Sequence, residues 1–227
     1  TRMIMINSPH NPTATLWSAE DLDQLAALTA GTGIVVVSDE VYEHIVFDGV
    51  LHRSCASHPG LAERSVIVSS FGKTYHITGW KVGYVVAPRA LMAEFRKVHQ
   101  FNVFTVNTPV QLALADYMAD AQRHLGLAAF YQAKRDHFRA GLAGSGFELL
   151  PSAGTYFQLV RYGKLSTLPD TQFCDWLTRE VGVAAIPVSA FFADGRDEGV
   201  IRFCFAKNEA TLDAACDRLR RLGGCRA

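Results

Sequence analysis

The stretch SFGKTYHITGWKVG, residues 70–83, carries most of the information in this chain. It places Lys73 in a turn rich in glycine and hydroxyl residues, directly after an apolar run at residues 65–69, and Lys81 follows eight residues later. A lysine amine in such a turn is suited to forming a Schiff base with a carbonyl compound. The neighbouring hydroxyls and the second cation could hold a phosphate beside that amine.

The composition is typical of a soluble, well-packed globular protein. Of the 227 residues, 49% are hydrophobic and 19% are charged, and 22 basic residues balance 22 acidic ones. A formal net charge of zero gives no support for binding to nucleic acid or to a membrane surface. The apolar runs at residues 34–37 and 82–87 are too short to span a bilayer. We therefore predict one or two domains, no nucleic-acid partner and no membrane partner.

The cysteines and histidines form no recognisable disulfide or metal-binding pattern. The five cysteines are scattered and include no Cys-x-x-Cys pair; they are Cys55, Cys174, Cys204, Cys216 and Cys225. The eight histidines contain no His-x-x-x-His spacing. We therefore expect reduced thiols, a cytoplasmic location and no metal site.

Strand-like and helix-like segments alternate over the first part of the chain. Apolar runs typical of buried strands lie at residues 3–7, 34–37, 65–69 and 82–87. Ser18, with Asp21 three residues on, predicts the start of a helix that ends near Gly31. This alternation predicts an α/β fold with a mostly parallel sheet.

The pattern changes after Pro88. Residues 89–143 have the periodicity of long helices with a break near residues 107–109. Further strands are expected near residues 147–150, 155–160, 183–186 and 200–205, and helices near residues 172–180 and after Asn208. We predict that residues 1–125 form part of a large domain and that residues 126–227 form a smaller α+β domain.

Polar side chains follow the first three predicted strands at the point where each strand ends. They are Asn11 after the first strand, Asp39 and Tyr42 after the second, and Ser70 and Lys73 after the third. Because ligands gather beyond the carboxyl ends of strands in a parallel α/β sheet, we expect these side chains to line one crevice. Three of them also have an ordinary explanation: Asp39 could cap a helix, Asn11 could form a turn and Tyr42 could be a core aromatic.

Four motifs occur in a fixed order along the chain: Asn11-Pro12-Thr13, Ser38-Asp39-Glu40-Val41-Tyr42, Ser70-x-x-Lys73 with Lys81, and Ile201-Arg202-Phe203. Together they resemble the signature of class I aminotransferases, which are pyridoxal-phosphate enzymes of fold type I. The branch that contains methionine aminotransferases and kynurenine–oxoglutarate transaminases is the most similar, because residues 69–74 and 78–83 fit it closely. The resemblance implies an α/β fold: the later part of a PLP-transferase type I large domain, mostly parallel sheet with helices, plus a smaller α+β C-terminal domain.

The resemblance implies a role for each matching residue. Lys73 would form the internal aldimine with pyridoxal 5'-phosphate and, once released, would move the proton between the substrate Cα and the cofactor. Asp39 would pair with the pyridine nitrogen and keep it protonated. Tyr42 and Asn11 would donate to the phenolic oxygen of the cofactor.

The remaining matches imply binding of phosphate and of substrate. Ser70 and Lys81 would hold the cofactor phosphate, although Lys81 could simply form a salt bridge. The planar guanidinium of Arg202 would bind the α-carboxylate of the substrate, with Asn11 in the same substrate site. The alternative for Arg202 is an exposed arginine on a strand.

Several other positions are ambiguous. Residues 104–109 correspond to a region that reaches toward the partner subunit in the family, but they also contain a simple helix break. Tyr75, His76 and Trp80 could line the pocket or pack in the core. Ala14 stands where the family often has a glycine, which affects the geometry of that turn.

The activity implied by the resemblance is transfer of an amino group from an amino acid to a 2-oxo acid by a homodimer. Methionine or aromatic amino acids are the expected donors. Two alternatives stay open: a carbon–sulfur β-lyase on the same fold, and the effector domain of a transcription regulator.

We also expect the sequence to be the later part of a longer protein. Residues 3–7 have the character of a strand buried on both faces, which needs neighbouring chain, and the family match covers only the later part of the family's usual length. The 227 residues alone are therefore expected to bind cofactor poorly and to be inactive.

Overall fold

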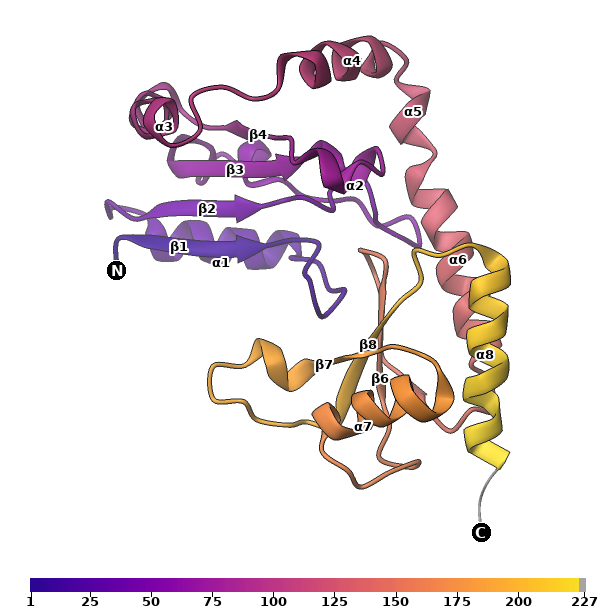
Figure 1. The fold of residues 1–227 in the computed structure, drawn as a ribbon. Helices are drawn as coiled ribbons and strands as arrows, with labels where there is room; N and C mark the ends of the chain where they lie inside the picture. The colour runs from indigo at the N-terminus through magenta and orange to yellow at the C-terminus, as the bar shows by residue number, and fades with distance from the viewer. Residues whose placement is uncertain (225–227) are drawn as a thin grey trace. The chain divides into compact units, whose positions relative to one another are not determined.

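Four strands form a mixed sheet in the first part of the computed structural model, which describes residues 1–224 (Figure 1). They are β1 (Met3–Asn7), β2 (Val35–Asp39), β3 (Ser65–Ser70) and β4 (Gly83–Val86). β1, β2 and β3 are parallel, whereas β4 pairs with β3 in the antiparallel direction. The connection from β3 to β4 holds only the short helices α2 (Phe71–Thr74) and η3 (Thr78–Trp80), which provide no crossover of the kind that parallel neighbours need.

The prediction that residues 3–7 are buried on both faces is wrong for the part of the chain that the structure describes. β1 lies at the edge of the four-stranded sheet, and the side chains of Met3 and Met5 are 57% and 72% exposed. Ile6, in contrast, is buried. The strand itself has the predicted bounds, so the pattern located the element but not the burial of its two faces.

Helix α1 (Ala19–Thr29) covers one face of this sheet through an apolar stripe. Ser18 and Asp21 form the predicted capping box, in which each side chain accepts a hydrogen bond from the backbone of the other residue. Gly31, just beyond the helix, has φ +68°, a left-handed conformation that favours glycine. The buried core beneath α1 consists of Ile6, Leu22, Leu25, Val36, Cys55, Leu61 and Ile67.

Helical segments follow the sheet, as the sequence predicted. They are α3 (Arg89–Asn102), α4 (Thr108–Met118), α5 (Gln122–Leu125) and α6 (Leu127–Gly141), and the single turns η1 (Cys55–Ser57) and η2 (Ala62–Arg64) precede β3. The break near residues 107–109 is confirmed: the Asn107 side chain accepts a hydrogen bond from Val110 N at 3.2 Å, and Pro109 occupies the first turn of α4.

The later part of the chain contains a second, wholly antiparallel sheet. Its strands are β5 (Glu148–Leu149), β6 (Phe157–Arg161), β7 (Ile186–Pro187) and β8 (Val200–Cys204), in the order β5-β6-β8-β7. The helices are α7 (Asp170–Trp176), its continuation η4 (Leu177–Val181), η5 (Val188–Phe191) and α8 (Glu209–Gly224). Asn208 caps α8 as predicted, since its Oδ1 accepts from Thr211 N at 2.8 Å. Cys225 lies outside the described residues.

The strand predicted at residues 183–186 is shorter than expected and begins only at Ile186. Gly182 adopts a left-handed backbone, and Val183 N donates to Leu177 O at 3.1 Å. The backbone of Val183 therefore closes the preceding helix and is not available to the sheet.

The contacts between Cα atoms divide the chain into two units. Unit 1 comprises Thr1–Pro9 and Leu16–Ala128, and unit 2 comprises His10–Thr15 and the chain from Ala129 onward. The short segment belongs to unit 2 because Ala14 O accepts hydrogen bonds from Ala153 N and Gly154 N. Across residues 1–224, none of the helices combines the length and the apolar character that crossing a bilayer requires.

Candidate active site

The carboxyl ends of β1 and β2 are tied together at Asp39. Asn7 and Asp39 are register partners, and Asn7 Nδ2 donates to Asp39 O at 2.9 Å. The Asp39 side chain turns back on its own loop, where Oδ1 accepts from Val41 N at 3.1 Å. The carboxylate is half-buried. Asp39 is therefore held at the end of its strand, as the sequence predicted.

Lys73 and Tyr42 lie close together beyond the ends of β2 and β3. Helix α2 starts at the end of β3, where Ser70 Oγ accepts from Gly72 N at 3.0 Å, and Lys73 is its third residue. The Nζ atom of Lys73 is 5.9 Å from the centre of the Tyr42 ring. Tyr42 is 3% exposed, so its position is set by packing. The structure thus brings together an amine and a phenol from two separate loops.

Ser70 also contacts the segment that carries Lys81. Its hydroxyl donates to Val82 O at 3.3 Å, and the exposed Lys81 ends η3 in a left-handed conformation. The turn between them is tight, because a Cβ atom on Gly72 would lie 2.9 Å from Thr78 Cα. Only glycine therefore fits there without a shift of the backbone. Ser70 and the Lys81 segment form one compact structure.

Arg202 and Asn11 meet within unit 2. Arg202 lies on β8, and its Nη1 donates to Asn11 Oδ1. The guanidinium carbon lies 4.0 Å from the centre of the Phe157 ring and 5.3 Å from that of Phe191. Arg202 is half-buried and held against aromatic rings, unlike the exposed strand arginine of the alternative interpretation.

The structure thus divides the predicted site residues into two groups. Unit 1 holds Asp39, Tyr42, Ser70, Lys73 and Lys81, and unit 2 holds Asn11 and Arg202. From the sequence we expected Asn11 both at the strand ends and in the substrate site with Arg202. The chain enters unit 2 at His10, and within that unit Asn11 contacts Arg202.

The ambiguous positions have different surroundings. Ala14 has φ +59° and is buried, so it adopts the left-handed conformation in which the family often has glycine. The Tyr75 ring lies 5.5 Å from Tyr117 in an edge-on contact, which is a packing role. Trp80 is 50% exposed. Phe104 is also exposed and has a left-handed backbone.

The residue after Asp39 is a buried carboxylate that the sequence patterns did not indicate. Glu40 is 1% exposed; its Oε1 accepts from Cys55 N at 3.0 Å and from the Ser38 hydroxyl at 2.9 Å, and Oε2 lies 2.9 Å from His52 Nε2. Burial alone would raise the pKa of Glu40, but hydrogen bonds from His52 and Ser54 and the charge of His52 lower it. Glu40 therefore anchors the loop that begins at Asp39.

Glu43 and His52 extend this group. The ligating atoms of Glu40, Glu43 and His52 lie within 4.8 Å of one another, a spacing that a metal ion could bridge. Hydrogen bonds to the two carboxylates already hold the group together. The sequence does not predict this group, because the group contains a single histidine and no regular metal-binding spacing. The sequence feature that could have indicated this group is the pair of glutamates on either side of Val41 and Tyr42.

The histidine beside this group predicts acid sensitivity. Burial lowers the pKa of His44 below 6.5; the charge of Glu43 opposes this, and the charges of His124 and His52 add to it. Below about pH 6.5 the unfolded chain therefore binds more protons than the folded one. The free energy of unfolding is highest above that pH and falls as the pH drops through it. We expect His44→Gln to flatten the loss of unfolding free energy between about pH 7.5 and pH 5.5.

Urea unfolding at the two pH values checks this prediction. His137→Gln, which changes a histidine that is 43% exposed in unit 2, serves as the control and should retain the slope that His44 causes. If the unfolding free energy of the His44 variant falls with pH as steeply as that of the unsubstituted protein, His44 does not resist protonation in the folded state.

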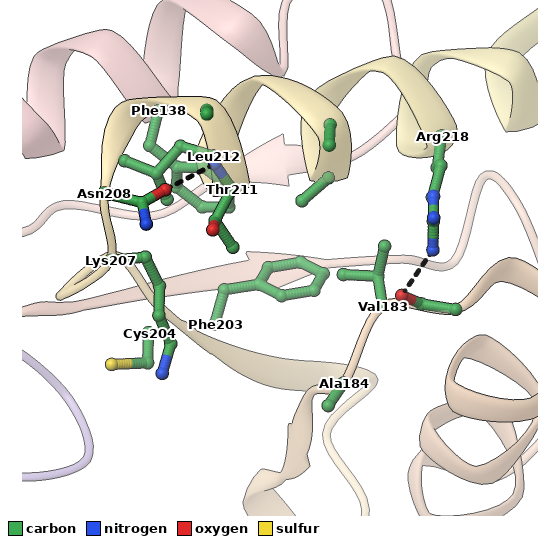
Figure 2. Close-up of a pocket in the computed structure, with 14 residues that line it drawn as sticks. Phe138, Val183, Ala184, Phe203, Cys204, Lys207, Asn208, Thr211, Leu212 and Arg218 are labelled. Atoms are coloured by element: carbon green, nitrogen blue, oxygen red, sulfur yellow. Dashed lines mark hydrogen bonds between the residues drawn. The ribbon is translucent and has the colours of Figure 1, made fainter.

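A separate cavity of about 520 Å³ opens in unit 2 (Figure 2). Phe138, Phe203, Val183 and Leu212 form much of its apolar wall, and the dashed line from Arg218 in Figure 2 marks its 3.0 Å hydrogen bond to Gly182 O. Neither Asn11 nor Arg202 lines this cavity. It is therefore distinct from the group of site residues within unit 2.

The chain has the fold of pyridoxal-phosphate transferases of type I. Its parallel strands end in Asp39 and Ser70, Lys73 lies in the turn that follows, and the antiparallel sheet carries Arg202. The chain belongs to the class I and II aminotransferase family, whose model, described as "Aminotransferase class I and II", matches residues 1–219. The resemblance found in the sequence is confirmed. Members of this family depend on pyridoxal phosphate.

Similar proteins agree with this assignment. The chain is 56% identical over 223 residues to a methionine aminotransferase of Escherichia coli (strain K12), a match that covers 98% of this chain and 58% of that protein. It is 35% identical over 243 residues to a kynurenine–oxoglutarate transaminase 1 of Rattus norvegicus, covering 97% and 57%. The chain thus spans less than two thirds of the length of these relatives.

Solved structures show the same fold. A methionine aminotransferase from Escherichia coli matches with a TM-score of 0.95 and 56% identity, covering 97% of this chain and 58% of that one. The N-succinyldiaminopimelate aminotransferase from Mycobacterium tuberculosis matches with a TM-score of 0.90 and 41% identity, covering 98% and 58%.

Proposed function

We propose that this chain, as it occurs in the whole protein, transfers an amino group from an amino acid to a 2-oxo acid with the help of pyridoxal 5'-phosphate. The observation that carries the proposal is the approach of Lys73 Nζ to the Tyr42 ring, at 5.9 Å from its centre, in a chain of the aminotransferase family. Methionine or an aromatic amino acid is the proposed donor. The first is supported by the Escherichia coli relative, whose name is methionine aminotransferase.

The chemistry of the residues present fits this cofactor. When bound, pyridoxal 5'-phosphate supplies an aldehyde that condenses with amines and a pyridinium ring that accepts electrons from the substrate Cα. A carboxylate, a phenol, an amine and a hydroxyl beside a cation are the complementary groups. The residues that would hold it are Asp39 at the ring nitrogen, Tyr42 and Asn11 at the phenolic oxygen, Lys73 at the aldehyde, and Ser70 with Lys81 at the phosphate.

Each residue then has one task. Asp39 would keep the proton on the ring nitrogen, because a half-buried carboxylate stabilises a neighbouring positive charge. Lys73 would remove the proton from the substrate Cα and return it to the cofactor carbon that carries the aldehyde, as a general acid–base. Tyr42 is held by packing with its ring facing the Lys73 amine. Its hydroxyl would fix the orientation of the cofactor ring.

Substrate would be held from unit 2. The Arg202 fork would bind the α-carboxylate with two parallel hydrogen bonds. The Phe157 ring at 4.0 Å supports the plane of the guanidinium. Asn11 Oδ1 accepts from Arg202, so the Asn11 amide nitrogen is the group that would donate toward the phenolic oxygen.

The assay that tests the proposal separates it from the β-lyase alternative. The whole protein is incubated with methionine and a 2-oxo acid, and separately with cystathionine alone. We expect formation of the new amino acid that depends on the oxo acid, and little release of pyruvate and ammonia. Release of pyruvate and ammonia without an oxo acid would support the lyase. Binding of cofactor without turnover in either assay would support the regulator.

Two further properties are part of the proposal. We propose a homodimer, on the basis of the family, and a cytoplasmic location. Four cysteines among residues 1–224 are free thiols, namely Cys55, Cys174, Cys204 and Cys216. Free thiols support a reducing compartment.

A further inference from the structure

The Glu43 carboxylate joins the loop after β2 to the strands β3 and β4. Its Oε1 accepts a hydrogen bond from Ser69 Oγ at 2.8 Å and another from Tyr84 OH at 2.5 Å. Ser69 and Tyr84 are register partners across the β3–β4 ladder. One oxygen atom of Glu43 therefore fixes a cross-strand pair at the end of the sheet where Ser70 and Lys73 follow.

On the other side, Glu43 belongs to a closed turn. Glu43 N donates to Glu40 O at 2.9 Å, and Ile45 N donates to Tyr42 O at 2.8 Å. Glu40 is itself buried and hydrogen-bonded, so the turn has little freedom. A displacement of Glu43 would therefore carry Tyr42 with it.

The contacts of Tyr84 extend the network to α2. The Tyr84 ring lies 5.2 Å from the Phe71 ring, and Phe71 is the first residue of the helix that carries Lys73. Burial and the hydrogen bond to Glu43 raise the pKa of Tyr84 to about 12, so the phenol stays protonated and remains a donor at neutral pH. His44 Nε2 lies 3.7 Å from Glu43 Oε1.

From these contacts we infer that Glu43 is a positioning residue, which sets the separation between Tyr42 and Lys73 by holding their two loops to the same pair of strands. The inference rests on the proposed function for its catalytic meaning. Its structural content is the coupling of the turn at residues 40–45 to the β3–β4 ladder through Glu43.

Amide hydrogen exchange on the 227-residue chain tests this coupling. In Glu43→Gln, the amides of Glu43 and Ile45 and those of β4 should exchange at least about tenfold faster together, because the loss of the charged acceptor loosens both sides. The amides of β6 and β8 should be unchanged. Glu63→Gln, at an exposed glutamate of the same unit, is the matched control and should change neither region.

Two outcomes would overturn the inference. One is faster exchange on only one side of Glu43, and the other is a uniform increase throughout unit 1, which indicates a general loss of stability. If Glu43→Gln does not fold, Tyr84→Phe keeps the carboxylate and removes one donor. It should raise the exchange rates of the same amides by a smaller factor. If these rates do not change, the inference is overturned.

A second readout reports on Lys73 itself. The whole protein is treated with pyridoxal 5'-phosphate and cyanoborohydride, and peptide mass spectrometry gives the ratio of labelling at Lys73 to labelling at the exposed Lys97. Glu43→Gln should lower this ratio at least about tenfold, and Glu63→Gln should not. If the unsubstituted whole protein shows no preference for Lys73, the proposed function loses its support, whereas the exchange experiment still decides the role of Glu43.

Discussion

Replacement of Lys73 by alanine in the whole protein is expected to lower kcat for transamination by at least about 10³-fold, because general acid–base catalysis alone contributes about 10²–10⁴-fold. The fold should survive, since Lys73 is only half-buried and lies in a short helix whose cap is made by Ser70. Steady-state formation of the product amino acid from methionine and a 2-oxo acid measures the effect.

The control for this prediction is Lys97→Ala. Lys97 is an exposed lysine on α3 that pairs with Glu94, and surface pairs of this kind contribute little to stability. Its variant should keep the original rate. A small primary amine added to the Lys73 variant should restore part of the activity, because it replaces the missing base. A Lys73→Ala protein with undiminished kcat would remove Lys73 from the mechanism.

The second large effect is expected at Arg202. Arg202→Ala should lower kcat/KM for amino acids by about 10²-fold or more, because truncation of one member of a hydrogen-bonded charge pair costs about 2–5 kcal/mol. The kcat/KM of Arg202→Lys should lie between the values of the unsubstituted protein and Arg202→Ala, since lysine keeps the charge but not the planar guanidinium. Initial rates at varied amino-acid concentration give kcat/KM.

Two comparisons make the Arg202 experiment specific. Arg161→Ala changes an exposed arginine on the neighbouring strand β6, which donates to Glu198 O, and should leave kcat/KM unchanged. A substrate amine without a carboxylate should react equally slowly with the unsubstituted protein and with the Arg202→Ala variant, because the lost contact is to the carboxylate. Undiminished kcat/KM for amino acids in Arg202→Ala would exclude Arg202 from substrate binding.

Local sequence patterns predicted the elements of the fold that depend on neighbouring residues. The capping box at Ser18, the cap at Asn208 and the break before α4 each involve residues within one turn of helix. An apolar run that ends in a polar residue likewise located Asp39 and Ser70 at strand ends. These patterns are local, so a single sequence contains them.

The features that local patterns did not predict depend on contacts between distant residues. Only the family resemblance put Asn11 and Arg202 in one substrate site, because no local pattern links residues that are 191 positions apart. Nor does any local pattern link Glu43 to its partners Ser69 and Tyr84, which lie on two strands further along the chain. The direction of β4 and the exposure of Met3 and Met5 likewise follow from which strands become neighbours.

The central claim is that one lysine of this chain, Lys73, is the amine that attaches to pyridoxal phosphate. The most direct measurement loads the whole protein with the cofactor, reduces it with borohydride and locates the added mass by peptide mapping. We expect a single stoichiometric adduct on the peptide that contains Lys73. An adduct on a different lysine, or a protein that holds the cofactor with no reducible attachment, would contradict it.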